Sequence, residues 1–151
     1  MIQVTELMSD EVKTLPVSAT MAEIYQLMRE NNIRHVPIVH ADGALLGIVS
    51  YLDVMAATPS KYDHEARNWQ TYSQTTAGEI MKSGLETMGP DASARQAARL
   101  MEKFKIGCLP IVNNGRLIGI ITDSDFLSMA INLMEQIDEA EAVDDLPDPD
   151  V

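Results

Sequence analysis

Cysteine is almost absent from this sequence, which contains only Cys108. One cysteine forms no internal disulfide, and without companion ligands at suitable spacing it does not indicate a zinc site. Cys108 lies in the apolar run 106–112, so we interpret it as a small buried residue and not as a nucleophile. The three histidines have no ligand-like spacing either, so we predict no metal and no required cofactor.

Long apolar runs and catalytic motifs are also missing. No apolar stretch approaches the roughly 18 residues that a membrane helix needs. The first residues lack the basic end and the apolar stretch of a signal peptide, so we expect a cytoplasmic protein without a membrane partner. The sequence has no catalytic triad, no Walker loop and no glycine-rich dinucleotide turn, which favours a protein that is not an enzyme.

Basic residues are scarce in this chain. It has 23 acidic and 11 basic residues, a net charge of −12, and residues 135–151 contain eight acids and no base. Such a charge repels a phosphate backbone, so nucleic acid is not an expected partner. We predict that residues 135–151 form an acidic, solvated and disordered tail, and the alternative is that this tail docks a basic partner.

What the sequence does contain is an internal repeat. A shift of 73 residues places Pro37–Val39 on Pro110–Val112, and a shift of 72 then places Asp53 on Asp125. Further identical pairs are Glu6 and Glu79, Met8 and Met81, Thr14 and Thr87, Leu27 and Leu100, Met28 and Met101, Ile33 and Ile106, Gly43 and Gly115, and Gly47 and Gly119. Identities clustered in this way indicate two copies of one structural unit.

Each copy contains the same order of structural signals. A capping box precedes apolar residues at helical spacing, and two apolar runs joined by Asp-Gly or Asn-Gly then form a hairpin pattern. The capping boxes are Thr20 with Glu23 and Ser93 with Gln96, and the second helices open at Ser50 and Thr122. We therefore predict an α+β fold of two β-α-β-β-α units, with short helical lead-ins at 5–8 and 76–81 and first helices that end near 31–32 and 104–105.

Four segments follow from this pattern. They are repeat 1 at 4–57, an inter-repeat connection at 58–75, repeat 2 at 76–134, and the acidic tail at 135–151. A single unit leaves one apolar face open, and the adjacent copy is the obvious cover for it. The connection is polar with three aromatic residues, so we expect an ordered excursion in which Trp69 is packed, without assigning the surface that it contacts.

The repeated pattern Glu-h-Met, capped helix, h-Pro-h-Val and Gly-h-h-[Ser/Thr]-x-x-Asp resembles the CBS domain, named after cystathionine β-synthase. The resemblance covers both repeats. It implies a pseudo-twofold module in which the two sheets pack together and two clefts between the repeats hold adenine nucleotides or related ligands. It also implies a homodimer, and the many apolar residues that follow Thr122 agree with this expectation.

The resemblance implies that Ser50 and Asp53, with their counterparts Thr122 and Asp125, bind the ribose and sometimes the phosphate of the ligand. A carboxylate can accept hydrogen bonds from both ribose hydroxyls, while a helix N-terminus offers N–H donors to phosphate. The alternative is that Ser-x-x-Asp and Thr-x-x-Asp are helix caps that need no ligand. The two roles can coexist.

Basic residues distinguish the two clefts. Arg34 and His35 precede the h-Pro of repeat 1, where the family often places basic residues that contact phosphate, whereas repeat 2 has Gly107 and Cys108 there. The alternative is an exposed Arg34 and a surface or half-buried His35 without a ligand.

In the family, the ribose aspartate of one repeat shares a cleft with the basic residues of the other. The competent cleft would then contain Thr122, Asp125, Arg34 and His35. The second cleft would contain Ser50, Asp53, Gly107 and Cys108, and would be empty or take an uncharged adenosine-like group. Adenine is expected near Thr14 and Thr87, for which the alternative is an ordinary strand residue of high β-propensity.

We therefore predict a regulatory module that binds AMP, ADP or ATP between its repeats and changes its conformation or its association with an unidentified regulated protein. S-adenosylmethionine and NAD-like molecules are alternative ligands. The alternative function is a ligand-free dimerisation or interaction scaffold.

Overall fold

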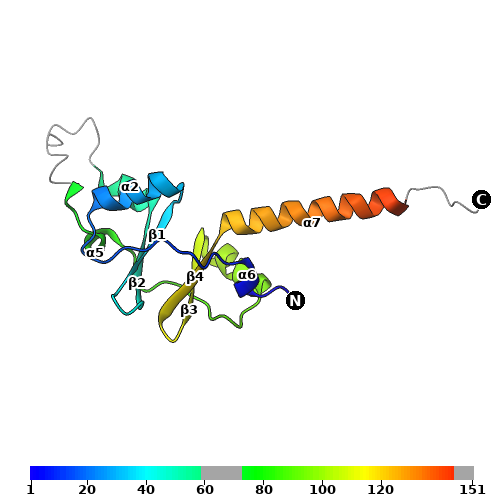
Figure 1. Ribbon diagram of the computed structural model, residues 1–151, viewed down its shortest axis with the longest axis horizontal. Helices are drawn as coiled ribbons and strands as arrows, with labels where there is room; N and C mark the ends of the chain where they lie inside the picture. The colour runs from blue at the N-terminus through cyan, green and yellow to red at the C-terminus, as the bar shows by residue number, and fades with distance from the viewer. Residues whose placement is uncertain (59–72, 145–151) are drawn as a thin grey trace, which may run out of the picture.

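The computed structural model describes residues 1–58 and 73–144 (Figure 1). Residues 59–72 and 145–151 lie outside the described residues, and the predicted packing of Trp69 lies there with them. Within the described residues, no helix is long and apolar enough to cross a membrane.

The element order agrees with two copies of one α+β unit. The first repeat contains α1 (Val4–Leu7), α2 (Met21–Asn31), β1 (His35–Val39), β2 (Leu45–Ser50) and α3 (Tyr51–Ala57); the second contains α5 (Ala77–Ile80), α6 (Ala94–Phe104), β3 (Cys108–Asn113), β4 (Arg116–Thr122) and α7 (Asp123–Asp144). The predicted first strand of each unit is shorter than expected. It consists of a single parallel bridge, from Leu15 to Ile38 and from Met88 to Ile111. Pro16 and the pair 89–90 follow these bridges, and proline cannot donate to a ladder.

Both predicted capping boxes are confirmed. The Thr20 hydroxyl accepts a hydrogen bond from the Glu23 N–H at 3.2 Å, and the Glu23 carboxylate accepts one from the Thr20 N–H at 2.8 Å. Ser93 and Gln96 form the same box at α6. The two helices end at residues with left-handed backbone, Asn32 and Lys105, close to where the apolar periodicity predicted.

Each repeat forms one two-stranded antiparallel sheet, β1–β2 and β3–β4. The turns use positive φ at Gly43 in the first hairpin and at Asn114 and Gly115 in the second. The two turns bind each other, because the Leu45 N–H donates to the Gly115 carbonyl oxygen at 3.1 Å and the Leu117 N–H donates to the Gly43 carbonyl oxygen at 3.0 Å. The two sheets therefore meet around a pseudo-twofold axis.

The short leading helices are exchanged between the repeats. Val4 of α1 is fully buried in the core of the second repeat, and Ala77 of α5 is fully buried in the core of the first. The chain after each short helix then crosses the other repeat's sheet, where Ser9 pairs with Ile120 and Lys82 pairs with Ile48. Each core is therefore completed by a helix from the other repeat.

Two glycines lie beneath these crossings. A Cβ atom on Gly47 would be 2.7 Å from the Lys82 carbonyl oxygen, and one on Gly119 would be 2.9 Å from the Ser9 carbonyl oxygen. Real Cβ atoms do not approach oxygen so closely, so these positions need glycine because the crossing backbone occupies the space.

The predicted disorder of the acidic tail is wrong for residues 135–144. Helix α7 runs for 22 residues, from Asp123 to Asp144, and projects away from the body (Figure 1). This segment is helical despite its acidic composition, because Leu133, Ile137 and Ala140 recur at four- and three-residue spacing and the helix contains no proline or glycine.

Candidate functional site

Each hairpin runs directly into a helix at the proposed ribose motif. Strand β2 ends at Ser50 and α3 begins at the next residue, while β4 ends at Thr122 and α7 begins at Asp123. The repeat therefore places the Ser-x-x-Asp and Thr-x-x-Asp motifs at equivalent helix N-termini. The two motifs use their polar atoms differently.

In the first repeat, Ser50 and Asp53 form a complete capping box. The Ser50 N–H donates to Asp53 Oδ2 at 2.8 Å, and the Asp53 N–H donates to Ser50 Oγ at 3.1 Å. The other carboxylate oxygen, Asp53 Oδ1, lies 3.3 Å from Nζ of Lys82. The Asp53 side chain is only 12% exposed, and both of its oxygens already have partners. The predicted capping role is confirmed for this pair.

In the second repeat, the box is only half formed. Asp125 Oδ2 accepts a hydrogen bond from the Thr122 N–H at 2.8 Å and a longer one from the Thr122 hydroxyl at 3.4 Å. Across residues 1–58 and 73–144, no hydrogen bond or ion pair engages Asp125 Oδ1. Ser9 occupies the position equivalent to Lys82 in the repeat, and its short side chain carries no charge. Asp125 therefore retains an acceptor that Asp53 has lost.

His35 lies at the boundary between the repeats. A Cβ atom on Gly107 would be 3.8 Å from His35 Nε2 and 3.5 Å from Asp123 Oδ2, so the missing side chain leaves room for the imidazole and the carboxylate. Burial lowers the pKa of His35, and the positive charge of Arg34 acts in the same direction, whereas the Asp123 and Asp53 carboxylates oppose this shift. The structure thus brings a half-buried imidazole of the first repeat to the first residue of α7.

Arg34 is exposed, and its guanidinium forms no ion pair with any residue of the two described segments. Its carbonyl oxygen accepts a hydrogen bond from the Tyr51 N–H at 2.7 Å, which fixes the backbone beside α3.

Cys108 pairs with Thr122 across the second hairpin. Burial, with the charges of Asp123 and Asp125, raises the pKa of the Cys108 thiol to about 12. Its interpretation as a small buried residue is confirmed.

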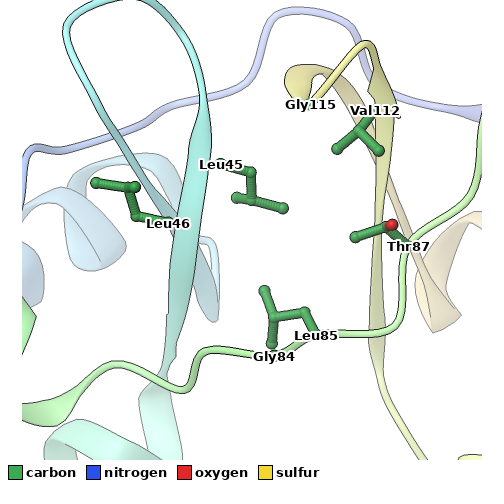
Figure 2. A pocket seen from close by; sticks show the side chains of 7 residues that line it. All are labelled: Leu45, Leu46, Gly84, Leu85, Thr87, Val112 and Gly115. Atoms are coloured by element: carbon green, nitrogen blue, oxygen red, sulfur yellow. The ribbon is translucent and has the colours of Figure 1, made fainter.

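A cavity of about 280 Å³ lies between the repeats at the turn ends of the hairpins (Figure 2). Leu45 and Val112 project into it from the two hairpins, and Leu85 projects from the chain that passes between them. Thr87 also lines this cavity. Ser50 lies five positions beyond Leu45 on β2, about 17 Å along the strand. The Met88 N–H donates to the Pro110 carbonyl oxygen at 3.1 Å, so Thr87 lies beside β3, whose first residue, Cys108, pairs with Thr122.

Thr14 is half-buried beside the Leu15–Ile38 bridge. Its side chain makes no hydrogen bond to the residues that the structure describes. In the repeat, Thr14 is the counterpart of Thr87, so the two threonines mark equivalent positions on the two sides of the pseudo-twofold axis.

The sequence of this chain matches the CBS domain family twice, at residues 4–60 and 77–132. The chain belongs to the CBS domain family. As a CBS pair, it is 30% identical over 139 residues to a CBS domain-containing protein of Dictyostelium discoideum, which covers 90% of this chain and 96% of the relative.

Solved CBS pairs share its fold. The structure of a protein assigned to acetoin utilization (AcuB) in Vibrio cholerae is similar with a TM-score of 0.78 and 41% identity, over 92% of this chain and 97% of that one. The CBS domain pair of protein MJ0100, in complex with 5′-methylthioadenosine and S-adenosyl-L-methionine, is similar with a TM-score of 0.74 and 26% identity, over 87% of this chain and 98% of that one. The predicted fold class and family are therefore confirmed.

Sequence reasoning missed two charged residues of this CBS pair. Lys82 binds Asp53, and Asp123 lies opposite His35. Both stand where the repeats differ, since Lys82 aligns with Ser9 and Asp123 aligns with Tyr51. The repeat alignment contained this signal, but a search for shared residues discards positions that differ.

Proposed function

We propose that this CBS pair is a sensor that binds an adenosine-containing ligand between its repeats, with the ribose on Asp125. The observation that carries this proposal is a contrast between two aspartates: Oδ1 of Asp125 has no partner among the described residues, whereas both oxygens of Asp53 are engaged. The solved relative that binds 5′-methylthioadenosine and S-adenosyl-L-methionine supports an adenosine ligand.

The proposed roles follow from the chemistry of each group. Asp125 Oδ1 accepts from a ribose hydroxyl, and the Thr122 hydroxyl supplies a second polar contact. The N-terminus of α7 offers N–H donors and positive potential, and Arg34 offers a guanidinium that no described residue pairs. Both features favour an anionic group on the ligand, so AMP, ADP and ATP remain ligands to test beside S-adenosylmethionine and NAD-like molecules. His35 borders the same region from the first repeat.

The proposal extends to the base. Thr87 and Thr14 are proposed adenine contacts, one on each side of the pseudo-twofold axis. The apolar walls of the cavity beside Thr87 suit a flat aromatic ring. Ser50 and Asp53 mark a second, weaker position, because Lys82 competes for Asp53.

The experiment is a thermal shift screen of AMP, ADP, ATP, 5′-methylthioadenosine, S-adenosylmethionine and NAD on ligand-free protein, followed by calorimetry. We expect one ligand class to stabilise the fold. The substitutions Asp125→Ala and Arg34→Ala should each weaken binding of that ligand about tenfold or more, because a hydrogen bond to a charged group contributes roughly 1.5–3 kcal/mol. Asp138→Ala, which removes an acid from the same helix away from the site, is the matched control. A flat screen, or unchanged affinity in both site variants, would overturn the proposal.

A second candidate function is a dimerisation scaffold. Its support is the set of exposed apolar side chains on α3 and the first turns of α7, where Leu52 is 76% and Leu127 is 64% exposed. We propose that these two helices form a homodimer through which a ligand signal reaches a regulated protein. Light scattering on the native protein and on Leu52→Gln/Leu127→Gln tests this, and a monomeric native protein would contradict it.

A further inference from the structure

Helix α7 has a portion without a counterpart in the first repeat. Helix α3 ends at Ala57, which aligns with residue 129 at the shift of 72, whereas α7 continues to Asp144. We call residues 130–144 the α7 extension. It is about 22 Å long and projects from the body (Figure 1).

The α7 extension carries an apolar face that nothing in the described chain covers. Leu133, Met134 and Ile137 are about half exposed, at 46%, 55% and 56%. With Ala130 and Ala140, they recur at three- and four-residue spacing, which places them on one side of the helix. A helix of this length is marginally stable alone in water, so an exposed apolar stripe indicates a missing partner.

The charge of this helix indicates what kind of partner fits. Helix α7 contains seven acids, which are Asp123, Asp125, Glu135, Asp138, Glu139, Glu141 and Asp144, and it contains no base. Two copies of the α7 extension, which holds five of these acids, would therefore place acid beside acid whether they paired parallel or antiparallel. The C-terminal turns also hold acids where the helix dipole favours cations. This charge disfavours both a second copy of the α7 extension and an anionic membrane surface as the partner of this segment.

We propose that the α7 extension docks a basic amphipathic helix of another protein. The partner's apolar side chains cover Leu133, Met134 and Ile137. Its lysine or arginine side chains pair with Asp138 and Glu141, each of which lies one helical turn after an apolar residue of the face. The same cations offset the negative end of the helix dipole.

The test measures binding of a labelled peptide to the full-length protein by fluorescence anisotropy. The probe is an amphipathic peptide of about 20 leucine and lysine residues with leucine at three- and four-residue spacing, long enough to form a helix on binding. A peptide with glutamate in place of every lysine is its control. We expect the lysine peptide alone to bind, with affinity that falls as salt is raised.

Two pairs of variants separate a docking face from general attraction to an acidic protein. Leu133→Gln/Ile137→Gln keeps every charge and should weaken the lysine peptide about tenfold or more. Asp138→Asn/Glu141→Gln should weaken it more than Glu135→Gln/Glu139→Gln, which removes the same charge from the opposite side of the helix. These side chains are exposed, so the variants should fold.

Three results would overturn the proposal: equal binding of both peptides, equal loss in the two charge variants, or a homodimer that Ile137→Gln converts to monomer. This inference is separate from ligand sensing, because Asp125→Ala should leave peptide binding unchanged.

Discussion

Nζ of Lys82 lies 3.3 Å from Oδ1 of Asp53, and this ion pair joins the second repeat to the first. Lys82 follows α5, and Asp53 lies in the first turn of α3. The equivalent pair on the other side of the axis is Ser9 and Asp125, which no ion pair joins within the described residues. The Lys82 side chain thus leaves the two aspartates with different numbers of available oxygen atoms.

Substitutions at Lys82 and Ser9 should change which of the two aspartates, Asp53 or Asp125, is available to bind ligand. Lys82→Ser frees Asp53 Oδ1, so we expect calorimetry with the stabilising ligand to show about two binding events per chain instead of one. Ser9→Lys should weaken the original site, because an ammonium group would compete for Asp125. Because the Lys82 side chain is 69% exposed, losing this ion pair should change the free energy of unfolding by about 1 kcal/mol or less. Unaltered stoichiometry in Lys82→Ser would contradict the proposed competition.

Alanine at either crossing glycine should destabilise the fold. The added Cβ on Gly47 or Gly119 meets backbone oxygen of the other repeat, which cannot move as a flexible side chain would. We expect a loss of about 3 kcal/mol in the free energy of unfolding, measured by urea denaturation. Gly89→Ala is the control, since its nearest atom would be 3.9 Å away, and it should unfold at nearly the native urea concentration.

Shortening Val4 should loosen the second repeat more than the first. Val4→Ala removes two methyl groups from a site with no exposure, at a cost of about 2 kcal/mol. Amide hydrogen exchange should speed up in α6, β3 and β4 more than in α2, β1 and β2. Ile2→Ala, at a side chain that is 45% exposed, should change little. Faster exchange confined to the first repeat would show that the leading helix does not contribute to the second core.

The stability of the protein should fall as pH falls through the titration of His35. Its folded-state pKa is below the ordinary value of 6.5, so the unfolded chain takes up the proton first. This contribution is therefore fully present above about pH 6.5 and is lost as the pH falls to the folded pKa. In thermal melts at pH 7.5 and 5.5, His35→Gln should lose less stability than the native protein. An equal loss in both proteins would assign the effect to other groups.

Much of the fold was predictable because the chain carries each signal twice. The capping boxes, the hairpin turns and the helix ends were found from local patterns such as Thr20 with Glu23 and Asn114-Gly115, and the structure confirms them. The exchange of α1 and α5 was not predicted, since no local pattern says which core Val4 enters. The predicted tail disorder failed because composition was weighed above the spacing of Leu133 and Ile137.

The candidate site was predictable only in part. Family resemblance pointed to Asp53 and Asp125 alike, but the difference between them depends on Lys82, which is distant in sequence from Asp53. Arg34 and His35 were named from the sequence. Asp123 was identified only from the structure, where it and His35 both lie beside Gly107. Contacts of this kind are set by tertiary packing, and no pattern in the neighbouring sequence predicts them.

The exchanged leading helices have a consequence for a chain that is cut between its repeats. A proteolytic nick within residues 59–72 would leave α1 on the fragment that carries the first sheet and α5 on the fragment that carries the second. Each fragment would still hold a helix inside the other's core. The nicked protein should migrate as one species until it is denatured, and neither fragment expressed by itself would possess a complete interior.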